Sequence, residues 1–154
     1  MSQSDAEARA GTSLRIERRG PALWLTLSRP DAMNSLTPEM VGGIDFCAGA
    51  DLKAVRAIAG EDAETARGRF VASVGALFRR LELHPKPVVA GVNGLAIAGG
   101  LELVLACDLV VAADTARFGD GHANFGLLPG GGASARLPRK VGPQLARHMM
   151  FTAE

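Results

Sequence analysis

The stretch from residue 88 to residue 113 constrains the fold of this chain more than any other part of the sequence. It holds an apolar run, a glycine pair, an apolar segment with one acid, and a second apolar run. Residues 88–92 are short, β-branched and bounded by proline and glycine, which predicts a buried strand, and residues 109–113 have the same character. The continuous apolar residues after Gly99 and Gly100 predict a buried helix between these strands. The stretch therefore indicates a strand–helix–strand unit of an α/β domain.

Glu102 is the only ionisable residue of this predicted helix and lies in its first turn. An unpaired buried carboxylate is costly, so we expect a partner, a raised pKa or an opening to a cleft. The first turn also presents backbone N–H groups without partners, at the positive end of the helix dipole. Gly99 and Gly100 carry no side chain that would block a ligand oxygen there. Alternatively, these glycines only allow the helix to pack closely against a strand.

Two nucleotide-binding motifs are excluded in this stretch. Gly94 and Gly99 have the separation of the glycines in a phosphate-binding loop, but Gly100 and Leu101 stand where lysine and serine or threonine are required. The GxGxxG spacing of a dinucleotide-binding fold is also absent here.

Composition indicates one domain with a sizeable core, because the 154 residues are 47% hydrophobic and carry a net charge of +1. We expect no nucleic-acid partner, and no membrane span, since glycines and acids interrupt the apolar runs. Residues 1–12 lack the features of a signal peptide, so we expect a disordered tail, a single core domain over residues 13–154, and a cytoplasmic location. Cys47 and Cys107 are expected to be buried thiols. The three histidines show no ligand spacing, so no metal site is predicted.

Local patterns predict the other elements. Alternating apolar residues on both sides of Gly20 predict a hairpin with one buried face over residues 14–27. An apolar stripe predicts an amphipathic helix over residues 61–83, followed by an exposed His84. We expect a short strand at residues 117–119, a flexible glycine-rich loop over residues 126–132 and a helix over residues 142–151.

A local conflict lies between Thr37 and Phe46. Thr37, Pro38 and Glu39 are a strong helix start, yet Gly42 and Gly43 follow almost at once. Natural sequences usually avoid such conflicts. We therefore expect that a segment is missing between Val41 and Phe46.

Four segments, in this order, resemble the motifs of the enoyl-CoA hydratase/isomerase (crotonase) family. They are residues 29–36 (RPDAMNSL), 46–53 (FCAGADLK), 92–108 (VNGLAIAGGLELVLACD) and 118–132 (FGDGHANFGLLPGGG). The resemblance implies an α/β fold of the ClpP/crotonase type, a spiral of ββα units. Family members place a helix and a core strand where the conflict lies, and further helices beyond residue 154. The resemblance therefore implies an incomplete spiral that lacks part of one ββα turn and the C-terminal helices.

The family forms an enolate from an acyl-CoA thioester, and its motifs assign roles by resemblance. Two backbone N–H groups, those of Ala50 and Gly99, would form the oxyanion hole, and Glu102 would be a catalytic acid or base. The remaining matched positions would contact coenzyme A or substrate: Ala32, Ala48, Asp51, Leu52 and Gly100. No metal or redox cofactor is implied, because coenzyme A enters as part of the substrate.

The second catalytic glutamate of a hydratase maps onto His122 in this chain. Histidine can act as a general acid or base near neutral pH. Alternatively, His122 is a loop residue with a structural hydrogen bond. Asp120 is a close neighbour that could orient the imidazole or replace it.

Two hypotheses for function follow from these features. The first is an acyl-CoA enzyme, most simply a 2-enoyl-CoA hydratase that uses Glu102 and His122. The second is a shortened, non-catalytic relative that serves as a CoA-ester-binding or interaction module. The family forms trimers, but the segments that build the trimer are mostly absent here, so a homo-oligomer stays an open expectation.

Overall fold

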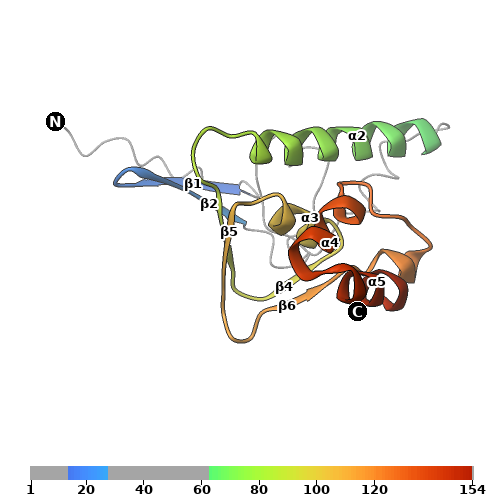
Figure 1. Ribbon diagram of the computed structural model, residues 1–154. Coiled ribbons are helices and arrows are strands. Elements are labelled where there is room, and N and C mark those ends of the chain that lie inside the picture. The colour runs from blue at the N-terminus through green and yellow to red at the C-terminus, as the bar shows by residue number, and fades with distance from the viewer. Residues whose placement is uncertain (1–13, 28–62, 154) are drawn as a thin grey trace.

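The structure, a computed structural model, describes residues 14–27 and 63–153. The expected tail, the expected gap near Val41 and the motifs at residues 29–36 and 46–53 lie outside the described residues. Figure 1 shows a hairpin at one end of the molecule, a long helix along one side, and shorter helices and strands beneath it. The elements are β1 (Leu14–Arg19), β2 (Ala22–Leu27), α2 (Ala63–Glu82), β3 (Val89–Val92), β4 (Leu95–Ile97), α3 (Gly99–Leu105), β5 (Leu109–Ala112), β6 (Arg117–Gly119), the 3-10 helix η3 (His122–Phe125), α4 (Ala133–Val141) and α5 (Pro143–Thr152).

The strands of the described residues form three two-stranded sheets. β1 and β2 are antiparallel, with Ile16 opposite Leu25. β3 pairs in parallel with β5, and β4 pairs in parallel with β6, so that Ile97 lies opposite Gly119. Along the chain α3 lies between β3 and β5, which confirms the strand–helix–strand unit predicted from the sequence. The short strand β4, just before α3, was not predicted.

α3 is the centre of the packing, and all seven of its residues are buried. One cluster joins it to α2, a second joins it to α4 and α5, and a third joins it to β3 and β4. The clusters contain Val74, Leu77, Phe78, Leu81, Leu103 and Ala106; Leu101, Leu105, Ala133, Leu137, Ala146 and Met149; and Ala90, Val92, Ala96, Val104 and Cys107. A helix held on several sides keeps the position of Glu102 fixed.

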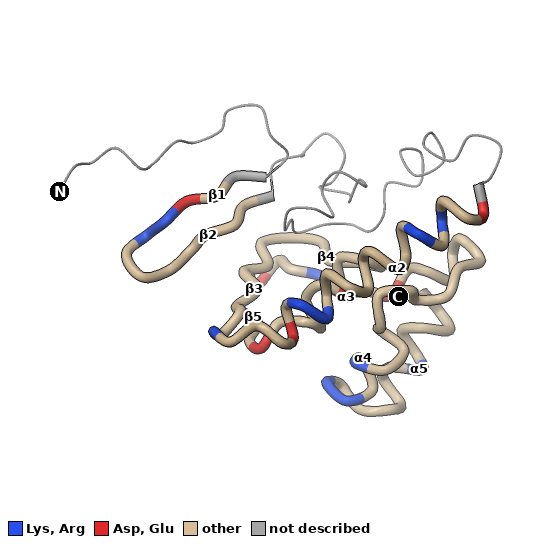
Figure 2. Tube along the Cα trace, turned by 90° about the horizontal axis from the view of Figure 1, so that it is seen from above, with Lys and Arg blue, Asp and Glu red and all other residues tan. Residues whose placement is uncertain are grey.

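Two other helices also follow the sequence prediction. α2 buries the expected stripe from Val74 to Leu81. Its arginines, at both ends of the helix, are exposed, and Figure 2 shows their positions in blue along the helix. α5 begins with Pro143, whose missing N–H costs nothing at the first helical position. α4, which is nine residues long and contains Pro138, was not predicted from the sequence. Proline removes a hydrogen bond from a helix interior, so it is an unusual residue at this position.

The predicted burial is wrong for the hairpin and for β5. Ile16, Leu23 and Leu25 are exposed, although they alternate as a buried face would. The hairpin lies away from α3, α4 and α5 (Figure 1). All four residues of β5 are exposed as well. The third cluster takes Ala90 and Val92 from β3 and no residue from β5. β3, also predicted to be buried, is buried at alternate residues only. Residue type therefore predicted the positions of these strands correctly and their burial incorrectly.

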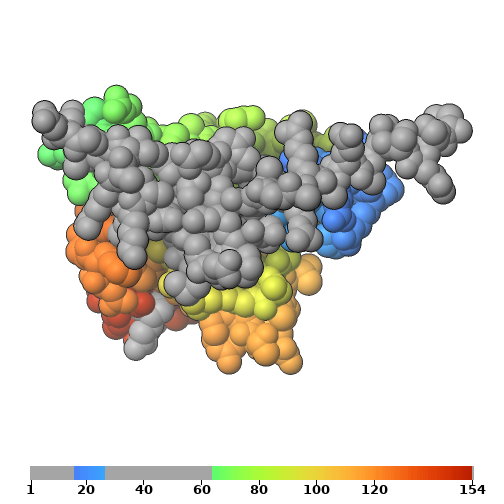
Figure 3. Space-filling view, turned by 180° about the vertical axis from the view of Figure 1, so that it is seen from behind, coloured from blue at the N-terminus to red at the C-terminus, as the bar shows by residue number. Residues whose placement is uncertain are grey.

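The opposite face of the molecule (Figure 3) shows α2 along its upper edge and the segments after β5 along its lower edge. Within residues 14–27 and 63–153, no helix is long and apolar enough to cross a lipid bilayer.

Phe78→Ala tests the packing of α2 on α3. The Phe78 side chain is fully buried, so its loss should lower the free energy of unfolding by about 3–5 kcal/mol. The matched control is Phe125→Ala, because Phe125 is 69% exposed and its loss should change stability by less than about 0.5 kcal/mol. Urea unfolding of both variants measures the difference, and equal losses would contradict the assigned packing.

Candidate active site

Glu102 is a buried carboxyl group held by a neighbouring loop. Its side chain is 3% exposed. Oε1 accepts hydrogen bonds from the backbone N–H of Gly131 at 2.7 Å and of Ala133 at 3.1 Å. These donors satisfy one of the two carboxyl oxygens, which confirms that the buried acid has partners.

Burial raises the pKa of Glu102 above its ordinary value near 4.5, and the Asp120 carboxylate acts in the same direction. The N–H groups of Ala133 and Gly131 and the imidazole of His122 lower it. Burial outweighs these favourable contacts, so the group keeps its proton to a higher pH than an exposed glutamate. A group with such a pKa can donate and accept protons in catalysis.

His122 lies beside Glu102, with its Nε2 atom 3.8 Å from Oε2 of the acid. This distance is too long for a hydrogen bond but allows close electrostatic contact. On the other side of the ring, Nδ1 is 3.2 Å from both carboxylate oxygens of Asp120. Asp120 is 1% exposed and His122 is 9% exposed. The three side chains form a buried row in the order Asp120, His122, Glu102.

The pairing of β4 with β6 brings the row together. The backbone N–H of Ala98, just after β4, donates to the carbonyl of Gly119 at 3.1 Å. The start of α3 therefore lies beside the segment that follows β6. Gly121 has a φ of 67°, in the left-handed region that favours glycine. The turn at Gly121 lets Asp120 and His122, two residues apart, face each other.

Gly99 begins α3, directly after a residue with an unusual backbone conformation. Ala98 has φ 50° and ψ −119°, a conformation that costs a residue with a side chain on the order of 1–3 kcal/mol. Its ψ angle sets the direction of the Gly99 N–H group. Among the described residues, none accepts a hydrogen bond from that N–H. Gly100 follows it in the same buried turn.

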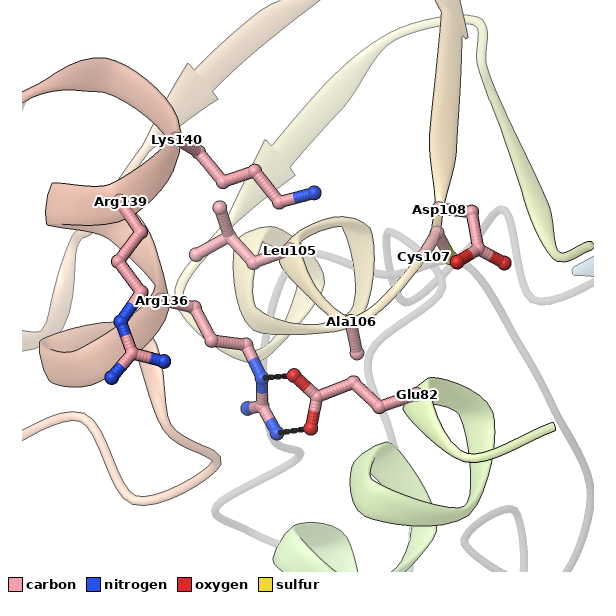
Figure 4. Close-up of a pocket in the computed structure, with 8 residues that line it drawn as sticks. All are labelled: Glu82, Leu105, Ala106, Cys107, Asp108, Arg136, Arg139 and Lys140. Carbon is pink, nitrogen blue, oxygen red and sulfur yellow. Dashed lines mark hydrogen bonds and ion pairs between the residues drawn. The ribbon is translucent and has the colours of Figure 1, made fainter.

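Arg136 supports the loop that binds Glu102. Its Nε and Nη2 atoms donate to the two carboxylate oxygens of Glu82, each at 2.8 Å, as Figure 4 shows. Its Nη1 atom donates to the carbonyl of Gly131. The bidentate contact lowers the pKa of Glu82. Arg136 thus links the end of α2 to the residue whose N–H holds Glu102.

The sequence predicted some of these residues and missed others. Glu102 and His122 come together as expected, and Asp120 contacts the imidazole. Gly131, Ala133 and Arg136 were missed, because their contacts join positions 29 and 31 residues apart along the chain, or involve backbone groups. The glycines at positions 130–132, just before α4, were the sequence signal that this backbone segment lies close to other groups. Ala32, Ala48, Ala50, Asp51 and Leu52 lie outside the described residues.

The other candidate groups stand apart from this row. Cys107 is a buried thiol, as expected, and burial raises its pKa to about 11. His84 is exposed after the end of α2. Within the part of the chain that the structure describes, no three His, Cys, Asp or Glu side chains are placed to hold a metal ion.

Gly131→Ala tests the close approach of the loop to Glu102. A Cβ atom at this position would lie 2.6 Å from Oε2 of Glu102 and 2.6 Å from a ring carbon of Phe78. We expect a loss of about 1–3 kcal/mol in the free energy of unfolding. A Cβ at Gly68, in α2, would meet nothing within 4 Å, so Gly68→Ala should add about 0.5–1 kcal/mol. Chemical denaturation distinguishes the two, and a stabilised Gly131→Ala variant would contradict the geometry.

Glu102→Gln tests the raised pKa through stability. The folded chain binds the Glu102 proton more tightly than the unfolded chain, so this proton stabilises the fold below pH 4.5. The contribution is lost as the pH rises through the folded pKa. The amide does not titrate, and its oxygen can still accept the N–H groups of Gly131 and Ala133. The stability of Glu102→Gln relative to the wild-type chain should therefore rise as the pH increases above 4.5 and through the folded pKa, as measured by urea unfolding at each pH. A relative stability that falls over this range would show a lowered pKa.

Comparisons with known proteins agree with the motifs. The model of the enoyl-CoA hydratase/isomerase family matches residues 42–154. The short-chain-enoyl-CoA hydratase of Clostridium acetobutylicum is 35% identical over an alignment of 164 positions, gaps included. The alignment covers 90% of this chain and 61% of that protein. The mitochondrial methylglutaconyl-CoA hydratase of Homo sapiens is 42% identical over 108 residues, which cover 70% of this chain and 31% of that protein.

Solved structures show the same fold. The crystal structure of an enoyl-CoA hydratase from Bacillus anthracis matches with a TM-score of 0.83 and 29% identity, over 93% of this chain and 64% of that one. This chain therefore spans less than two thirds of the length of these three relatives. The family model covers well over half of the chain, and the fold agrees with it. The chain belongs to the enoyl-CoA hydratase/isomerase (crotonase) family and carries part of the crotonase fold.

Proposed function

We propose that this chain acts on acyl-CoA thioesters and, most simply, adds water to the double bond of a 2-enoyl-CoA. The observation that carries the proposal is the buried pair of Glu102 and His122, whose facing atoms are 3.8 Å apart. A carboxyl group with a raised pKa next to an imidazole supplies both a proton donor and a proton acceptor near neutral pH. The hydratase names of the relatives support the same chemistry.

The thioester oxygen would be held by the N–H groups of Gly99 and Ala50. Gly99 lies one turn before Glu102 in α3, and among the described residues nothing accepts its N–H. Such a donor typically contributes about 3 kcal/mol to transition-state stabilisation. The role of Ala50 rests on the resemblance of its motif to that of the family.

The substrate would be bound mainly by residues of the same motifs. We assign contacts with coenzyme A or the acyl group to Ala32, Ala48, Asp51, Leu52 and Gly100. Water addition to an enoyl thioester transfers one proton from water to a base and one proton from an acid to the α-carbon, so it requires neither a metal nor a redox cofactor. Coenzyme A enters as part of the substrate.

A second candidate is a CoA-ester-binding module without catalysis. One observation favours it: a histidine, His122, stands where the resemblance implies a second catalytic glutamate. Binding without turnover would identify this function.

Loss of the conjugated thioester absorbance of crotonyl-CoA measures hydration directly. We expect turnover by the wild-type chain, and a loss of kcat by a factor of about 10² to 10⁴ in Glu102→Gln, because the proton donor or acceptor is removed. The KM should change little, since the amide keeps the shape and the backbone contacts of the acid. A cooperative melt of each sample comes first, to show that it is folded.

The outcomes separate the two candidates. Equal rates for the wild-type chain and Glu102→Gln would remove Glu102 from the mechanism. If crotonyl-CoA binds to the folded wild-type chain without being hydrated, the binding module is the correct function.

A further inference from the structure

We propose that the Asp120–His122 pair is the base that takes a proton from water in this site, and that Glu102 is the acid that protonates the substrate carbon. Asp120 is then a positioning residue, which holds the imidazole as the tautomer with a hydrogen on Nδ1 and a free lone pair on Nε2. The roles of His122 as base and Glu102 as acid rest on the proposed function, whereas the tautomer of His122 and its NMR test do not.

The contacts of Asp120 define the tautomer. Its Oδ1 atom accepts the backbone N–H of His122 at 3.3 Å, and both of its oxygens lie 3.2 Å from Nδ1. A carboxylate only accepts hydrogen bonds, so the hydrogen between the two groups belongs to Nδ1. A neutral imidazole carries a single N–H, which leaves Nε2 as an acceptor facing Glu102.

The contacts of Glu102 place its proton. Oε1 already accepts the N–H groups of Gly131 and Ala133. Among the described residues, no hydrogen-bond donor reaches Oε2, which faces Nε2 of His122 at 3.8 Å. Oε2 is therefore the oxygen that carries the hydrogen. Burial also raises the pKa of this group, which favours its protonated form relative to that of an exposed glutamate.

The charges around the pair come from two directions. Burial is the main cause of the raised pKa of Glu102. The Asp120 carboxylate, which follows β6 and lies against His122, acts in the same direction, whereas the imidazole of His122 lowers this pKa. Arg136, from α4, is close enough that Glu102 raises its pKa, although its main partner is Glu82. When His122 gains a proton, the resulting imidazolium lies against the Asp120 carboxylate. Asp120 thus lies at Nδ1, on the side of the ring opposite the nitrogen that takes the proton.

The proton transfers balance over one turnover. The oxygen of water bonds to the β-carbon of the enoyl thioester, and one proton of that water passes to Nε2 of His122. The electron pair of the carbon–carbon double bond moves into the thioester enolate. The α-carbon then takes the proton from Oε2 of Glu102. Return of the Nε2 proton to the Glu102 carboxylate restores both groups, and the net change is the addition of one water molecule.

Nitrogen NMR of the ¹⁵N-labelled full chain reads the tautomer without any assay of activity. The chain has three histidines, and His122→Gln and His84→Gln assign their ring signals. We expect His122 to carry its hydrogen on Nδ1 near neutral pH. A hydrogen on Nε2 in the wild-type chain would overturn the proposal.

Asp120→Asn is the decisive variant. Its amide oxygen should keep the contact with the backbone N–H of His122, which turns the NH₂ group toward Nδ1 and makes Nδ1 an acceptor. The hydrogen should then move to Nε2, and kcat for crotonyl-CoA should fall by a factor of about 10² to 10⁴ at unchanged KM. Asp114→Asn, at an exposed aspartate, should leave the His122 signals and the rate as in the wild-type chain.

These measurements test the tautomer of His122 and the proposed hydration activity separately. A moved hydrogen with an unchanged kcat would overturn the role of His122 as the base. A wild-type chain that has the expected tautomer but no hydration activity would contradict the proposed function, and it would leave the positioning role of Asp120 supported.

Discussion

The buried carboxyl group of Glu102 is the constraint on which the rest of the structure depends. A carboxyl group removed from water needs hydrogen-bond donors, and it finds them in the N–H groups of Gly131 and Ala133. These bonds tie α3 to the segment that begins α4, where the apolar contacts of Leu101 and Leu105 with Leu137 continue the attachment. The side of Gly131 that faces Glu102 has no room for a methyl group. One ionisable side chain thus accounts for the glycine at position 131 and for the attachment of the start of α4 to α3.

The same constraint gives the site its chemistry. The parallel pairing of β4 with β6 places the start of α3 beside Asp120 and His122 at the carboxyl ends of the two strands. Side chains that follow neighbouring parallel strands commonly form the functional site of an α/β protein. Here the result is an acid, an imidazole and a second acid in one buried row. Burial raises the pKa of the Glu102 carboxyl group, which lies next to the imidazole of His122.

Local sequence patterns predicted the elements better than their surroundings. The glycine pair and the apolar run after it identified α3, and the need of a buried acid for partners identified Glu102 as a special residue. The identity of those partners is a property of the folded chain, because Gly131 and Ala133 contribute backbone groups from a distant segment. The exposure of the hairpin and of β5 was missed for a similar reason: β-branched and alternating patterns show that a strand forms but not what covers it. α4, which has Pro138 in its interior, was not predicted. The family itself was predictable, because its motifs combine chemistry and order along the chain.

The central claim is that Glu102 is an acid whose burial keeps it protonated to a higher pH than an exposed glutamate. A ¹³C NMR titration of the Glu102 side-chain carboxyl carbon tests this claim most directly, with the signal assigned by its absence in Glu102→Gln. The structure predicts a titration midpoint above the ordinary value near 4.5, in the folded wild-type chain. A midpoint at or below that value would show that the N–H groups of Gly131 and Ala133 outweigh burial, and it would contradict the account.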